Sequence, residues 1–223
     1  MPHSAPEPIA SGIDLYWIPL GAGGSGLVRW NGRMYEAAQA RRERRVRLDL
    51  YHTALEVRLP DARFIVENAW PSPDADTSSR GVVIEGTVFS RRISRFRWFR
   101  YEVRRWRDGV IADAGEAVAS PHIVSDDPWR ARRLLDLVPA VPALIWGRDE
   151  LGTGEMWNSN SVISWLLARS GVPDEAIGRP PAGGRAPGWA SGLTVAHRQQ
   201  ESKGLIVSPQ VRNRAAAGGV TVE

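Results

Sequence analysis

Hydrophobic and polar residues alternate along much of the first half of the chain, which is the spacing of half-buried strands. From about residue 128 the spacing changes to that of helices, first over 128–138 and then from Ser159 to a stop at Gly171. A strand-rich middle followed by helices predicts an α+β fold, with an antiparallel sheet packed against the helix that begins near Ser159. The strands are expected around residues 50–57, 63–69, 82–89 and 97–113.

The first two of these strands form a hairpin if the Leu59–Ala62 loop pairs Arg58 with Arg63. One face of the hairpin then carries Leu55, Val57, Phe64 and Val66, and the other carries His52, Glu56, Ile65 and Glu67. In this register Glu67 lies diagonally close to His52.

Two further turns are expected from short sequence signals. The run Gly21–Gly26 formally matches G-x-G-x-x-G, but a dinucleotide-binding turn must open a helix. The pair Asn31-Gly32 instead predicts a type I′ hairpin, so no dinucleotide site is expected. Asp108-Gly109 predicts another hairpin, which returns the chain into Val110-Ile111-Ala112.

Composition limits the class of protein. The 223 residues are 43% hydrophobic and 24% charged, which suits one principal domain over 13–198 with flexible segments at 1–12 and 199–223. Zero cysteines exclude disulfides and thiolate metal sites, and four scattered histidines form no zinc pattern, so neither metal nor cofactor is expected. With no leader-like or membrane-spanning apolar run, the expected location is cytoplasmic.

Two segments carry the clearest candidate chemistry. "LYHTALEV" at 50–57 contains His52, and "WNSNSVISWLLARSG" at 157–171 places Ser159 at a helix start. Free backbone N–H groups and the positive end of the helix dipole meet there, so a hydroxyl at that place can be activated; it can equally be an ordinary helix cap.

Together the two segments resemble the histidine strand and nucleophile helix of permuted papain-like enzymes, the group with the LRAT-like acyltransferases and related amidases. Ser159 stands where that group has its cysteine. The resemblance implies hydrolysis or acyl transfer on an amide or ester in a peptide, lipid or conjugate, with Ser159 as nucleophile and His52 as base. Glu67 would orient the imidazole, with Glu56 and Glu85 as alternatives, and amides of Asn160 or Ser161 would bind the oxyanion.

Two other functions remain open. A serine depends wholly on an adjacent base, so the chain can also be a catalytically silent papain-like protein that binds a partner. The stretch 91–107 alternates arginines with aromatic residues, which would suit a basic nucleic-acid-binding module. The same alternation is typical of a half-buried strand in which Phe96, Trp98 or Tyr101 faces the core, and for that reason the sequence does not favour nucleic acid as a partner.

Overall fold

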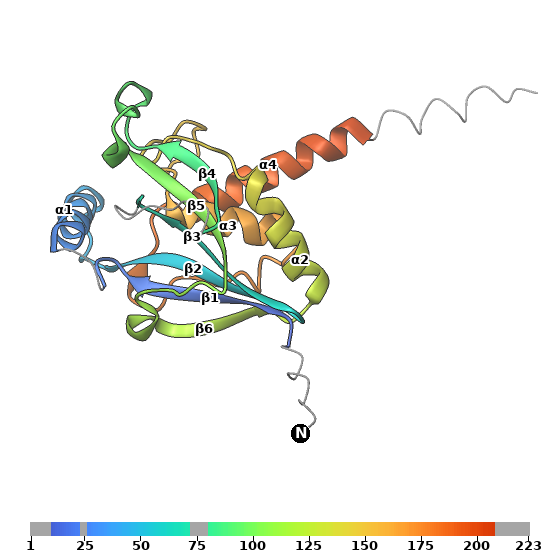
Figure 1. Ribbon diagram of the computed structural model, residues 1–223. Helices are drawn as coiled ribbons and strands as arrows, with labels where there is room; N and C mark the ends of the chain where they lie inside the picture. The colour runs from blue at the N-terminus through green and yellow to red at the C-terminus, as the bar shows by residue number, and fades with distance from the viewer. Residues whose placement is uncertain (1–9, 23–25, 72–79, 208–223) are drawn as a thin grey trace, which may run out of the picture.

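The computed structural model describes residues 10–22, 26–71 and 80–207. Its centre is a twisted sheet in the order β4-β5-β3-β2-β1-β6, in which all these neighbours pair antiparallel (Figure 1). A short β7 pairs parallel with the start of β2. The strands are β1 Gly12–Pro19, β2 Asp49–Leu59, β3 Ala62–Ala69, β4 Val82–Thr87, β5 Arg100–Arg107, β6 Val118–Ser125 and β7 Gly184–Arg185.

Four α-helices accompany the sheet: α1 Gly26–Glu43, α2 Pro128–Leu137, α3 Ser159–Arg169 and α4 Trp189–Val207. Helices α2 and α3 pack on one face of the sheet, and α4 packs on α3 from outside (Figure 1). The expected α+β class and the antiparallel sheet packed against α3 are therefore confirmed. Among the described residues no helix is long and apolar enough to cross a membrane.

The β2–β3 hairpin has the register expected from its sequence. Arg58 pairs with Arg63, and Leu59 pairs with Ala62 across the turn. Leu55, Val57 and Val66 belong to the main core on the α3 side, whereas Ile65 belongs to a smaller cluster on the opposite face. Alternation of side chains along each strand thus divides this hairpin between two environments.

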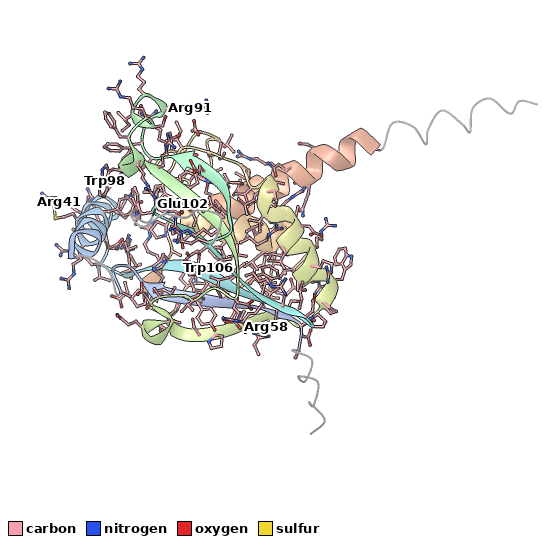
Figure 2. All side chains as sticks on the ribbon, viewed as in Figure 1. Arg41, Arg58, Arg91, Trp98, Glu102 and Trp106 are labelled. Atoms are coloured by element: carbon pink, nitrogen blue, oxygen red, sulfur yellow. The ribbon has the colours of Figure 1, made fainter. Side chains whose placement is uncertain are left out.

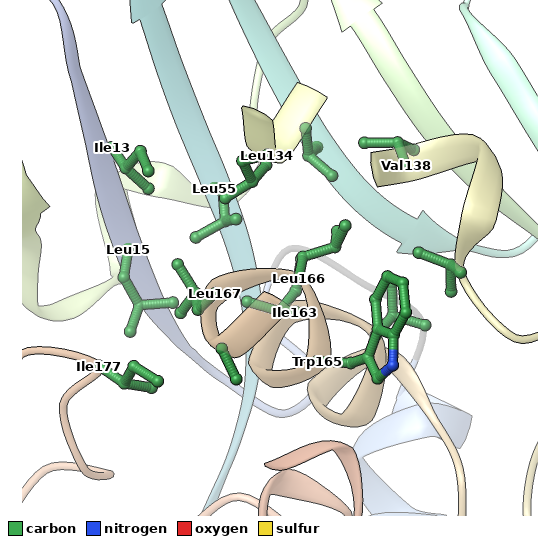
Figure 3. Packing of buried hydrophobic residues seen from close by; sticks show 14 of the residues in the cluster. Ile13, Leu15, Leu55, Leu134, Val138, Ile163, Trp165, Leu166, Leu167 and Ile177 are labelled. Carbon is green, nitrogen blue, oxygen red and sulfur yellow. The ribbon is translucent and has the colours of Figure 1, made fainter. Parts of the chain in front are cut away.

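Helix α3 is more deeply buried than its sequence suggests. The expected helix is amphipathic, but all its residues from Ser159 to Arg169 are buried. The sheet and α2 cover one side and α4 covers the other, so no side of α3 meets solvent. Figure 3 shows Ile163, Leu166 and Leu167 of this helix packed beside Leu15 and Leu55 of the strands.

Two local expectations, a hairpin at Asn31-Gly32 and a flexible tail from residue 199, are wrong. Residues 26–43 form α1 rather than a hairpin at Asn31-Gly32, because the alanine-, glutamine-, glutamate- and arginine-rich sequence after Tyr35 favours a helix. A βαβ dinucleotide site still has no support, since β1 runs antiparallel to both its neighbours. The tail expected from residue 199 continues as α4 to Val207.

The hairpin expected at Asp108-Gly109 is also absent from the described structure. Strand β5 already pairs with β3 on one side and β4 on the other, so neither of its edges is free to pair with the chain that follows Asp108-Gly109. It crosses the sheet instead and forms β6 beside β1. The strand expected over 97–113 is therefore limited to 100–107.

Candidate functional site

The start of α3 is capped by Asn158 rather than by Ser159. Asn158 Oδ1 accepts hydrogen bonds from the backbone N–H of Asn160 at 2.9 Å and of Ser161 at 3.4 Å. In return, Ser161 Oγ accepts the backbone N–H of Asn158 at 3.1 Å, which completes a capping box. Both amides expected to hold an oxyanion are therefore already engaged.

Asn160 ties the helix to the sheet. Its Oδ1 accepts a hydrogen bond from Thr53 Oγ1 at 3.0 Å, and its Nδ2 donates to the backbone carbonyls of Tyr51 at 3.0 Å and Pro187 at 2.9 Å. The residue is 3% exposed. Because these partners come from β2 and from the segment before α4, one amide side chain fixes three parts of the chain.

The two inner serines of α3 hold the beginning of α4. Ser161 Oγ donates to the carbonyl of Gly188, and Ser164 Oγ donates to the carbonyl of Trp189, each at 2.8 Å. The Gly188 carbonyl also accepts the backbone N–H of Gly192 at 3.2 Å, so the serine hydroxyls add side-chain hydrogen bonds that join α3 to the first turn of α4. The polar residues of "WNSNSVISW" thus serve mainly to satisfy buried backbone groups.

The structure does not bring Ser159 and His52 together. Thr53 points toward α3, as its bond to Asn160 shows, so the adjacent His52 points to the opposite face of the sheet. There His52 pairs with Ile18, a member of the smaller cluster. Ser159 is 6% exposed, and its hydroxyl forms no hydrogen bond within the described part of the chain. The sheet therefore separates the expected nucleophile from the expected base.

His52 and Glu67 do share one face of the sheet, as expected. Burial lowers the pKa of His52, against the opposing effect of Asp113. Burial likewise raises the pKa of Glu67, although Arg104 acts to lower it. The Glu67 carboxylate accepts a hydrogen bond from Arg104 Nη1 at 2.9 Å, so within the described residues its partner is an arginine and not the imidazole.

The other candidate acids and bases have structural partners of their own. Glu56 pairs with Arg63 at 3.1 Å, and Glu85 pairs with Arg100 at 3.3 Å. Outside these candidates, His197 lies 3.3 Å from Asp174 on the surface. Within the described residues no group of three or more histidines and carboxylates could hold a metal ion.

A second candidate site is the connection between β4 and β5, which projects from the sheet as residues 89–99; we call it the basic arm (Figures 1 and 2). It contains two short 3₁₀ turns, Arg91–Ile93 and Arg97–Phe99. Three aromatic side chains on the arm are exposed: Phe89 by 57%, Phe96 by 48% and Trp98 by 81%. Of the three aromatic residues expected to face the core, Tyr101 does so and is 1% exposed, whereas the expectation is wrong for Phe96 and Trp98.

Phe96 and Trp98 are exposed because the alternation of strand β5 begins only after them. Strand β5 starts only at Arg100, so Tyr101 and Val103 alternate into the core, whereas the residues of the preceding 3₁₀ turns do not. The sequence itself signals the unusual charge of the arm, because residues 86–101 include no acidic residue and five arginines. The Arg95 guanidinium lies 4.8 Å from the centre of the Phe96 ring.

Comparison with known proteins adds no assignment to these two sites. No family model, no curated protein and no solved structure matches this chain. What the fold and sites define is an α+β protein with a buried helix start, rich in hydrogen bonds, on one side of its sheet and an exposed basic, aromatic arm at one edge.

Proposed function

We propose that this protein is a catalytically silent, papain-like binding protein whose basic arm binds single-stranded nucleic acid. The papain-like part rests on the order of the elements: a histidine-bearing strand precedes a buried helix that begins at Asn-Ser and packs on an antiparallel sheet. Catalytic silence follows from the positions of Ser159 and His52 on opposite sides of that sheet and from the engaged amides of Asn160 and Ser161.

The observation that carries the binding proposal is the exposure of Trp98 and Phe96 among arginines. Stacking of a base on an aromatic ring contributes roughly 1–3 kcal/mol per base, and arginines supply contacts to phosphates. Phe89, Phe96 and Trp98 offer rings, while Arg91 and Arg95 lie within the same arm. The Arg91 side chain is 76% exposed, and its one ion pair within the described part of the chain is a long one, 3.8 Å, with Glu150.

The geometry favours unpaired bases over a duplex or a membrane. Rings can stack only on bases that have left a duplex, and the arm has neither a helix nor a strand pair to enter a groove. Insertion into a bilayer would draw the Arg95 guanidinium, which lies over the Phe96 ring, into hydrocarbon. The same stacked pair can remain intact beside a base and a phosphate.

Fluorescence anisotropy with a labelled single-stranded oligonucleotide tests this proposal. Trp98→Ala should weaken binding about 5- to 150-fold, which corresponds to about 1–3 kcal/mol. Arg95→Gln should weaken binding and lower the salt slope by about 1 between about 50 and 200 mM salt. Trp129→Ala is the matched control, because Trp129 is 59% exposed on α2 and also has an arginine, Arg133, over its ring at 5.1 Å.

The result that would refute the proposal is equal loss in Trp98→Ala and Trp129→Ala, or equal affinity for duplex and single strand. Tighter binding to vesicles with equal parts anionic and zwitterionic phospholipid would identify the arm as a membrane contact instead. Catalytic silence has its own test: a fluorophosphonate probe should not label the protein. Labelling that disappears in both Ser159→Ala and His52→Ala would restore the hydrolase hypothesis.

A further inference from the structure

A pocket lies beside α1 and the neighbouring ends of β1 and β2, and none of the residues that line it belongs to the basic arm. Its volume is about 660 Å³, within the range of small-molecule sites. Three parts of the chain line it: the inner side of α1, the segment that enters β2, and the ends of β1 and β6. The lining residues are Pro19, Leu20, Arg33, Glu36, Arg47, Leu48, Asp49, Leu50, Tyr51 and Val118.

More than half of this lining is apolar or aromatic. Leu20, Leu48 and Leu50 are partly buried, and Tyr51 is 6% exposed. The Tyr51 ring lies against Gly184 so closely that a side chain there would overlap it, which holds the ring in place. The pocket therefore has an apolar wall on which a hydrocarbon chain could bury its surface.

Of the two carboxylates in the lining, Glu36 is already neutralised. It is 3% exposed, receives hydrogen bonds from Arg45 and from the backbone N–H of Leu48 at 3.0 Å, and lies 3.8 Å from Arg185. An acid held by two guanidinium groups offers little to a ligand. The charge available in the pocket is therefore set by the remaining charged residues.

Those residues are Arg33, Arg47 and Asp49. Within the described residues none of the three forms an ion pair at 4.0 Å or less, and all three are exposed at the pocket mouth. Two guanidinium groups against one carboxylate leave an excess of positive charge. Arginine is well suited to carboxylate recognition because its planar N–H donors match the two oxygens.

We propose that this pocket binds an organic carboxylate with an unbranched apolar tail. The head group contacts Arg33 and Arg47 at the mouth, and the tail lies on Leu20, Leu48 and Leu50. This site is independent of the proposed nucleic-acid binding, since the two share no residue.

Calorimetric titration of the whole protein with decanoate tests the proposal. Saturable binding of decanoate is expected, with decanol at least about tenfold weaker because it lacks the charge. Acetate should not bind measurably, because it has no tail. Arg33→Ala and Arg47→Ala should each weaken decanoate about tenfold or more.

Arg41→Ala is the matched control, because Arg41 is an exposed arginine of the same helix that does not line the pocket. It should leave decanoate affinity unchanged, as should Trp98→Ala in the arm. The proposal is overturned if decanoate fails to saturate, if Arg33→Ala and Arg47→Ala behave like Arg41→Ala, or if decyltrimethylammonium binds as tightly as decanoate, which would make Asp49 the head-group partner. Circular dichroism of each variant confirms that the fold is retained.

Discussion

Replacing Asn160 by alanine should destabilise the fold far more than replacing its neighbour Ser159. The Asn160 amide makes three hydrogen bonds, to Thr53 Oγ1 and to the carbonyls of Tyr51 and Pro187, in a site that is 3% exposed. Ser159 is almost equally buried, at 6%, yet its hydroxyl makes no hydrogen bond within the described residues. The two adjacent positions, almost equally buried but differently bonded, therefore isolate the contribution of the hydrogen bonds to stability.

The size of the Asn160 effect follows from its partners. Each hydrogen bond contributes about 0.5–1.5 kcal/mol net, and each buried group left unsatisfied costs about 1–3 kcal/mol. Pro187 O retains a second donor, Asn158 Nδ2 at 2.8 Å, so only the Thr53 hydroxyl and the Tyr51 carbonyl lose a partner. We expect a loss of about 3–5 kcal/mol, which is a large part of the roughly 5–15 kcal/mol that stabilises a typical domain.

Urea denaturation followed by tryptophan fluorescence measures this loss, since the chain contains 10 tryptophans. Ser159→Ala should stay within about 1 kcal/mol of the parent, because Asn158 and not Ser159 caps the helix. Thr53→Val should lower the free energy of unfolding by part of the amount that Asn160→Ala does. The double variant should lower it by less than the sum of the two single variants. If Ser159→Ala matched or exceeded Asn160→Ala, our account of the helix start would be refuted.

Two further predictions concern the other face of the sheet and the α3–α4 contact. Because burial lowers the pKa of His52, acidification below about pH 6.5 protonates His52 mainly in the unfolded chain, and the protein becomes less stable. In urea denaturation, His52→Gln should therefore lose less stability on acidification than the parent. If the free energy of unfolding changed equally with pH in both proteins between about pH 7.5 and 5.5, this prediction would be contradicted. Gly192→Ala would gain about 1 kcal/mol from helix propensity alone, but its Cβ would overlap Ser161 O and Ser164 Oγ, so we expect net destabilisation of about 1–3 kcal/mol. Thermal unfolding should show this loss, whereas Gly115→Ala, with no atom within 4 Å of the new Cβ, should be nearly neutral.

Sequence alone could predict those parts of the fold that local chemistry determines. The Arg58–Arg63 register follows from alternation on both sides of a short turn. Helix α2 begins where Asp127 caps it before Pro128, and α3 ends before Gly171, whose φ of 86° suits glycine. In each case the signal and the structure it specifies lie within a few residues of each other.

Other parts depend on contacts that a local pattern does not contain. The fate of the chain after Asp108-Gly109 depends on whether β5 has a free edge, and β3 and β4 already occupy both edges. Strand β6 was missed altogether, because its residues from Val118 to Ile123 are mostly exposed and show no simple alternation. The exposure of Phe96 and Trp98 likewise depends on where pairing of β5 begins.

The candidate catalytic pair, Ser159 and His52, shows what a likeness between short motifs can predict and what it cannot. The strand, the helix and their order were predicted from the sequence, but whether an imidazole meets the helix depends on the pleat, in which adjacent residues face opposite ways. The bond from Thr53 to Asn160 sets that phase. A histidine facing α3 from this part of β2 would have to occupy a position in phase with Thr53, and at position 53 itself it would remove that bond. In this chain the polar start of α3 and the histidine of β2 therefore belong to different environments, and the chemistry of each has to be considered separately.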